Sequence, residues 1–151
     1  MNAPVLEPQA LTVAGTRFEL VAPPVPEYVA SSWCATYRRI APLAMPVGLW
    51  VEGQRRIIRD LEPCTVALVT PDAPHTIHAW VCASPGVLHY VFVAQPLRRL
   101  GIAKALVEAT AGRTGAFTHH KPKELARAFS GFTFNPYALT DAVRRAHARR
   151  P

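Results

Sequence analysis

The clearest hydrophobic pattern in this chain lies between residues 87 and 109, VLHYVFVAQPLRRLGIAKALVEA. Its first seven residues read as a strand that is apolar on both faces. Strict alternation divides them into one face with His89, Val91 and Val93 and another with Leu88, Tyr90 and Phe92. Such a strand is typical of the interior of a sheet that is covered on both sides. We therefore expect this strand to be central.

A basic, glycine-containing turn follows the strand. Pro96 has no N–H to donate and ends the strand, and the spacing of Ile102 and Leu106 predicts a helix from residue 102. The first N–H groups of a helix lack partners within it, and its dipole is positive there. The sequence therefore predicts an anion site for a phosphorylated cofactor. We assign to this site Arg98, Arg99, Leu100, Gly101, Ile102, Ala103 and Lys104.

The same analysis predicts an α/β (α+β) fold with the element order β-α-α-β-β-β-α-β-α-β and a further helix at the end. Strands are expected at 16–22, 64–70, 76–83, 87–95, 116–118 and 132–134, and helices at 26–40, 49–61, 102–109, 123–129 and from Thr140. The three strands between residues 64 and 95 are joined by short turns, which predicts an antiparallel meander. Residues 1–13 are expected to form a flexible arm or a loosely laid strand. Residues 14–151 are expected to form a single domain.

Composition indicates a globular protein with an anionic partner. Half of the 151 residues are hydrophobic and 18% are charged, which excludes a disordered chain. The formal net charge of +7 favours coenzyme A, nucleic acid or both as partners. Cys34, Cys64 and Cys82 form no CxxC motif and are odd in number, which predicts reduced thiols. No apolar run reaches the length of a membrane span, and no signal-peptide pattern opens the chain, so we expect a cytoplasmic protein without membrane partners.

The basic turn resembles motif A of the GNAT (Gcn5-related N-acetyltransferase) superfamily. That motif reads Arg/Gln-x-x-Gly-x-Gly/Ala after a strand, and Arg98, Gly101 and Ala103 fill it here. The strong match covers residues 92–107. The resemblance implies a mixed, mostly antiparallel sheet with helices on both faces, whose strands part after the fourth of the predicted strands. It also implies that the turn binds the pyrophosphate of acetyl-CoA.

The resemblance further implies acetyl transfer from acetyl-CoA to an amine. In GNAT proteins the strand before the turn pairs with the pantetheine arm, and one of its backbone N–H groups, here near Phe92 or Val93, polarises the acetyl carbonyl. Many members place a glutamate on that strand or its neighbour as a base. This chain instead has His89 and Tyr90 on the strand and His78 on its neighbour.

Four side chains are candidates for catalysis. His89 is either a general base, because imidazole titrates near neutrality, or a histidine packed in the core. Tyr90 either hydrogen-bonds the substrate or is a core tyrosine with a satisfied hydroxyl. The resemblance places His119 at the rim where GNAT substrates approach. It also makes Tyr137, in the sequence FNPY, the nearest replacement for a tyrosine acid that the helix at 123–129 lacks, although Asn-Pro-Tyr is also an ordinary turn.

The six histidines do not predict a metal site. His75 and His78 are separated by two residues, and His119 and His120 are adjacent. Neither spacing is a recognised zinc pattern, and no cysteine pair supports either one.

Two further functions are compatible with the chain. The segments FTHHKP, FNPY and RRLGIA look like those of small GNAT-like proteins encoded by bacteriophages and prophages. One phage branch of this fold, the Mom-type proteins, modifies adenine in DNA, and the positive net charge suits such a partner. The other alternative is a non-catalytic binding protein that retains the fold.

Overall fold

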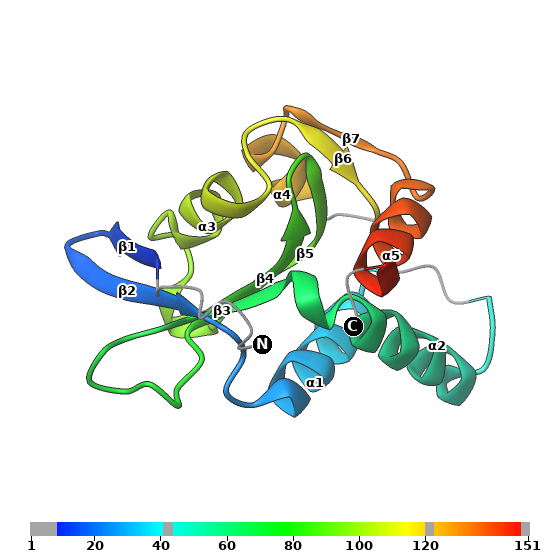
Figure 1. The fold of residues 1–151 in the computed structure, drawn as a ribbon, viewed down its shortest axis with the longest axis horizontal. Coiled ribbons are helices and arrows are strands. Elements are labelled where there is room, and N and C mark those ends of the chain that lie inside the picture. The colour runs from blue at the N-terminus through cyan, green and yellow to red at the C-terminus, as the bar shows by residue number, and fades with distance from the viewer. Residues whose placement is uncertain (1–8, 41–43, 120–122, 149–151) are drawn as a thin grey trace.

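A seven-stranded mixed sheet organises the computed structural model, which describes residues 9–40, 44–119 and 123–148 (Figure 1). The strands are β1 (Gln9–Val13), β2 (Thr16–Val21), β3 (Thr65–Val69), β4 (Ala79–Ser84), β5 (Val87–Val93), β6 (Gly115–Phe117) and β7 (Phe132–Phe134). They lie in the sheet in sequence order, antiparallel from β1 to β5 and parallel from β5 to β7. The predicted α/β class, the mostly antiparallel sheet and the meander of β3 to β5 are thus confirmed.

Helices cover both faces of this sheet, as predicted (Figure 1). They are α1 (Pro26–Tyr37), α2 (Val47–Asp60), α3 (Ile102–Thr110), α4 (Lys123–Ala128) and α5 (Ala138–Ala148), with short 3₁₀ turns at Glu62–Cys64 and Gln95–Leu97. α3 packs on one face, where Leu106 and Val107 are fully buried. α1, α2 and α5 pack on the other, where the predicted spacing of Val29, Trp33 and Tyr37 buries one side of α1. None of the described helices is both long and apolar enough to cross a membrane.

The first described residues form a strand and not an arm. β1 pairs along its whole length with β2 through a two-residue turn, in which Ala14 and Gly15 both have positive φ. Two such residues are typical of the hairpin turns that match the twist of the strands. Of the two alternatives for residues 1–13, the strand is therefore confirmed and the flexible arm is corrected for residues 9–13, while residues 1–8 lie outside the described part of the chain.

The register between β4 and β5 shifts by one residue at His89, which forms a β-bulge. Leu88 consequently lies in the same core as Val91, whereas Tyr90 lies in the core on the opposite face. Strict alternation had placed Leu88 on the face of Tyr90. That placement is wrong because one extra residue in a strand exchanges the faces of every residue beyond it.

β6 runs beside only the first residues of β5. Val87 pairs with Ala116, Leu88 pairs with Phe117, and the Thr118 N–H donates to the Leu88 carbonyl at 3.2 Å. β5 then continues to Val93 beside β4, but no described strand lies along the other side of this part of it. The sheet therefore has an internal open edge.

A substitution at Gly115 tests how closely β6 packs against the chain at the start of β5. A Cβ at this position would overlap the carbonyl oxygen of Gly86, which accepts the Ala116 N–H at 2.9 Å. We expect Gly115→Ala to lower the free energy of unfolding by about 3 kcal/mol, because backbone must move. Gly53→Ala is the matched control, since a Cβ in the middle of α2 meets nothing within 4 Å. It should raise stability by about 0.5–1 kcal/mol. Denaturant unfolding of the three proteins checks this, and equal effects would contradict the strand packing.

Candidate cofactor and catalytic site

The predicted anion-binding turn connects β5 to α3 and has an unusual backbone. Arg99 has φ 68° and Gly101 has φ 82°, so both lie in the left-handed region. Glycine adopts this conformation freely, but it costs arginine on the order of 1–2 kcal/mol. Strained residues of this kind cluster at functional sites.

The N-terminus of α3 presents unpaired N–H groups. Its first helical hydrogen bond runs from the Ala105 N–H to the Gly101 carbonyl at 3.0 Å. The N–H groups of residues 102–104 make no hydrogen bond to any described residue, and no side chain caps the helix. Ile102 is buried and Ala103 half-buried, so both offer only backbone to a ligand, whereas Leu100 and Lys104 are exposed. The arrangement suits an anion.

Arg98 ties the turn to the end of β5. Its Nε–H donates to the Val93 carbonyl at 3.0 Å, and its guanidinium carbon lies 6.0 Å from the centre of the Phe92 ring. Both contacts leave the outer part of the Arg98 guanidinium exposed. Arg99 is exposed as well. The predicted cations of the turn are therefore available on its solvent side.

The open edge of β5 exposes particular backbone groups. The Ala94 N–H donates to the His78 carbonyl at 2.9 Å. Because bonded and non-bonded pairs alternate in an antiparallel ladder, Phe92 bonds to β4, while Val91 and Val93 direct their N–H groups away from it. Of the two predicted donors, the geometry thus favours Val93 over Phe92.

His89 belongs to a buried polar chain at the point where β5 and β6 part. The Thr118 hydroxyl lies 2.9 Å from Nδ1 of His89 and 2.9 Å from Nδ1 of His119. A hydroxyl has one proton, so it donates to one imidazole and accepts from the other. Thr118 was not among the predicted site residues, yet it links two that were.

The environment of His89 makes it a weak base. Its side chain is fully buried, and Nε2 has no hydrogen-bond partner among the described residues. Burial, reinforced by His119 and Arg145, lowers the pKa of His89 to about 3. Its geometry favours the packed-histidine alternative over a base that meets the amine directly.

His119 is buried by aromatic rings. Its ring meets Trp33 and Tyr37 edge-on, with centroid distances of 5.1 and 5.3 Å. A direct contact with substrate therefore requires these rings to move. His120 lies outside the described residues.

Tyr90 is part of an aromatic stack beneath α1. Its ring stacks on Trp33 at 4.8 Å and on Trp80 at 5.5 Å, and its hydroxyl lies 2.7 Å from the Thr36 hydroxyl. Burial raises the pKa of Tyr90, against the lowering effect of the Thr36 hydrogen bond. These contacts favour a core tyrosine with a satisfied hydroxyl.

Tyr137 is the most accessible of the four catalytic candidates. Its side chain is 81% exposed immediately before α5, and its N–H donates to Oδ1 of Asn135 at 3.1 Å. The Asn-Pro-Tyr sequence is thus a turn that presents a tyrosine to solvent.

The described residues contain no group of three histidine, cysteine, aspartate or glutamate side chains placed to hold a metal ion. Comparisons of the chain with protein-family models, with curated proteins and with solved structures find no match.

Proposed function

We propose that the protein is an acyl-CoA-dependent N-acyltransferase of the GNAT type, which transfers an acetyl group from acetyl-CoA to an amine. The observation that carries this proposal is the junction of two features. The open edge of β5 leads directly into a basic turn and an unpaired helix N-terminus. A long ligand with one end anionic and the other rich in amide groups matches both.

The element order supports the same fold. From β2 onward the chain follows β-α-α-β-β-β-α-β-α-β, with β5 and β6 parallel and separating after two pairs. This is the order expected for a GNAT domain. β1 and α5 are additions at its two ends.

The residues present fit acetyl-CoA at specific positions. The N–H groups of residues 102–104 would hold the pyrophosphate, with Arg98, Arg99 and Lys104 supplying positive charge. The N–H groups of Val91 and Val93, which point away from β4, would pair with the pantetheine arm, as an added strand does.

The chemistry needs an electrophilic carbonyl, a neutral amine and an acid. Acetyl-CoA supplies the thioester that the amine attacks. The Val93 N–H would donate to the carbonyl oxygen, where negative charge develops. Tyr137 is exposed and is the candidate to return a proton to the sulfur of the leaving group. His89 and Thr118 would act only through His119, which is itself buried and would meet a substrate only when the rings of Trp33 and Tyr37 move.

Thermal unfolding with acetyl-CoA tests this function. At about 100 times its Kd the cofactor should add roughly 2.7 kcal/mol of stability and raise Tm by several degrees. Adenosine, which lacks the pyrophosphate and the pantetheine arm, is the control and should give no comparable shift. Absence of a shift with acetyl-CoA would overturn the proposal. DNA binding that weakens steeply with salt would then favour the DNA-modifying alternative.

A further inference from the structure

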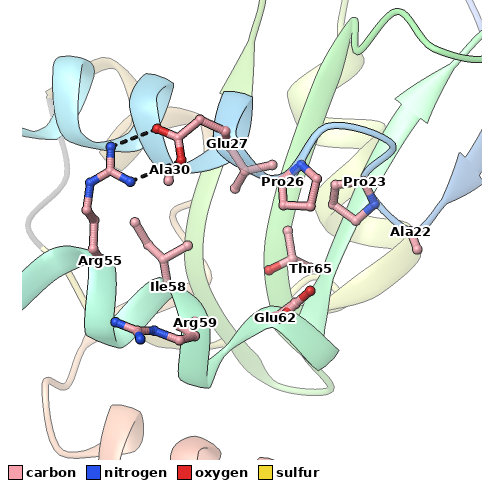
Figure 2. A pocket seen from close by; sticks show the side chains of 11 residues that line it. Ala22, Pro23, Pro26, Glu27, Ala30, Arg55, Ile58, Arg59, Glu62 and Thr65 are labelled. Atoms are coloured by element: carbon pink, nitrogen blue, oxygen red, sulfur yellow. Dashed lines mark hydrogen bonds and ion pairs between the residues drawn. The ribbon is translucent and has the colours of Figure 1, made fainter.

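A pocket of about 340 Å³ lies between α1, the second half of α2 and the start of β3 (Figure 2). None of its described lining residues belongs to β5, α3 or the basic turn. The pocket is therefore separate from the proposed cofactor site. Its volume falls at the lower end of the range for small-molecule sites.

One part of the lining is apolar and rigid. Pro23 and Pro26 lie next to each other in it (Figure 2), and proline fixes its own backbone angle without an N–H that needs a partner. The buried residues Val29 and Ala30 of α1 continue this surface, and the side chain of Ile58 reaches it from α2. A compact aliphatic or aromatic group can pack here without reorganising the backbone.

Three of the four charged side chains in the lining are already engaged. Arg55 donates from Nη1 and Nη2 to the two carboxylate oxygens of Glu27, at 3.1 and 2.7 Å, so these two charges neutralise each other. Arg59 has an interaction of its own, and its guanidinium extends away from Glu62 and the prolines (Figure 2). The remaining charge in the pocket is the carboxylate of Glu62.

The surroundings of Glu62 favour a positive charge. Glu62 makes no ion pair with any residue that the structure describes, and its carboxylate is directed toward Thr65 and Pro26 (Figure 2). The buried Thr65 hydroxyl donates its proton to the Leu61 carbonyl at 3.1 Å, so its oxygen can accept a hydrogen bond from a ligand. α2 ends at Asp60, which places the negative end of the helix dipole beside the same carboxylate.

An apolar wall beside an unpaired acid defines the class of ligand. We propose that the pocket binds a small primary ammonium ion with a compact apolar tail, such as a branched alkylamine or an arylalkylamine. The ammonium group donates to the Glu62 carboxylate and the Thr65 hydroxyl, and the tail packs between Pro26 and Ile58. A carboxylate of the same shape is excluded because Glu62 repels it. A neutral alcohol gains the apolar contacts but lacks the charge-assisted hydrogen bond.

Ligand-observed NMR titration with isopentylamine and phenethylamine tests the pocket without reference to acyl transfer. Both amines should bind with Kd values in the millimolar range, as expected for ligands of so few atoms. Isopentanol has the same tail without the charge and should bind about fivefold more weakly, and isovalerate should show no measurable binding. The proposal is overturned if neither amine binds, or if isopentanol or isovalerate binds as well as isopentylamine.

A charge variant locates the ammonium group. Glu62→Gln, at an exposed position that tolerates substitution, should weaken isopentylamine about fivefold and leave isopentanol unchanged. Glu52→Gln is the matched control, because it removes the same charge from an exposed side chain of α2 outside the lining, and it should bind isopentylamine like the parent. Equal losses in the two variants would show a general effect of net charge and would overturn the assignment to Glu62.

A size variant locates the apolar tail. Ile58→Trp fills the pocket and should abolish binding of both isopentylamine and isopentanol. Leu49→Trp, at a 61%-exposed position of the same helix, should leave both affinities unchanged. If the parent, Glu62→Gln and Ile58→Trp proteins bind isopentylamine equally well, the amine lies elsewhere and the proposal is wrong.

Discussion

The free energy of unfolding is expected to fall by about 4 kcal/mol between pH 6.5 and pH 3 on account of His89 alone. Burial holds the pKa of His89 at about 3 in the folded protein, against an ordinary value of 6.5 in the unfolded chain. Between these values the unfolded chain binds a proton that the folded protein does not. Stability is therefore complete above pH 6.5 and is lost as the pH falls toward 3.

His89→Asn isolates this contribution. Asparagine cannot take up a proton in this range, and its side-chain amide can replace the hydrogen bond between Nδ1 and the Thr118 hydroxyl. The variant should lose stability at pH 7, where a cavity replaces part of the ring, but should show a much shallower pH dependence. His75→Asn removes an exposed imidazole and should follow the parent curve. Urea unfolding at several pH values measures all three proteins, and parallel curves for the parent and His89→Asn would contradict the buried neutral histidine.

The same histidine marks the limit of what the sequence reveals about the fold. Apolar spacing predicts α1 and the strands around it, because Val29, Trp33 and Tyr37 must share a buried face. A β-bulge does not change the order of apolar and polar residues along a strand, but it moves the side chains beyond it to the other face of the sheet. The position of Leu88 therefore depends on the register of β4, which no local pattern encodes.

The edges of the sheet are also hard to predict. β1 is an exposed or half-buried strand, QALTV, with no continuous apolar face. Its pairing depends on the turn at Ala14 and Gly15 and on the neighbouring strand, so its own residues give little signal. α5 begins at Ala138, two residues before the predicted start at Thr140, because Asn135 organises the preceding turn through its side chain and carbonyl.

The sequence likewise predicts one part of the candidate site and leaves the other part undetermined. The basic turn is local, so its charge, glycine and helix start can be identified from consecutive residues. The partners of the catalytic candidates are distant in sequence: Thr118 is 29 residues from His89, and Thr36 is 54 residues from Tyr90. Whether an imidazole or a phenol is satisfied in the core depends on such contacts, and these are fixed only by the packing of β6 and α1 on β5.

Gly101→Asp is expected to weaken acetyl-CoA binding by about a hundredfold or more, and this prediction rests on the proposed function. The carboxylate would lie at the helix N-terminus where the pyrophosphate is proposed to bind. Two like charges about 4 Å apart at a protein surface repel by about 4 kcal/mol. A Cβ at Gly101 meets nothing within 4 Å, so the effect would come from charge and not from collision.

Gly101→Asn is the matched control for this substitution. Asparagine has nearly the same size as aspartate, and both residues tolerate the left-handed backbone that position 101 requires. Gly101→Asn should therefore bind acetyl-CoA within about tenfold of the parent, while Gly101→Asp combined with Arg98→Ala should show no measurable binding. Titration calorimetry at low and high salt separates the effect of charge from that of side-chain size. Added salt should reduce the difference in acetyl-CoA affinity between the Gly101→Asp and Gly101→Asn variants. If the two variants bind equally well, the anionic part of the cofactor does not lie at this turn, and the open edge of β5 loses its proposed ligand.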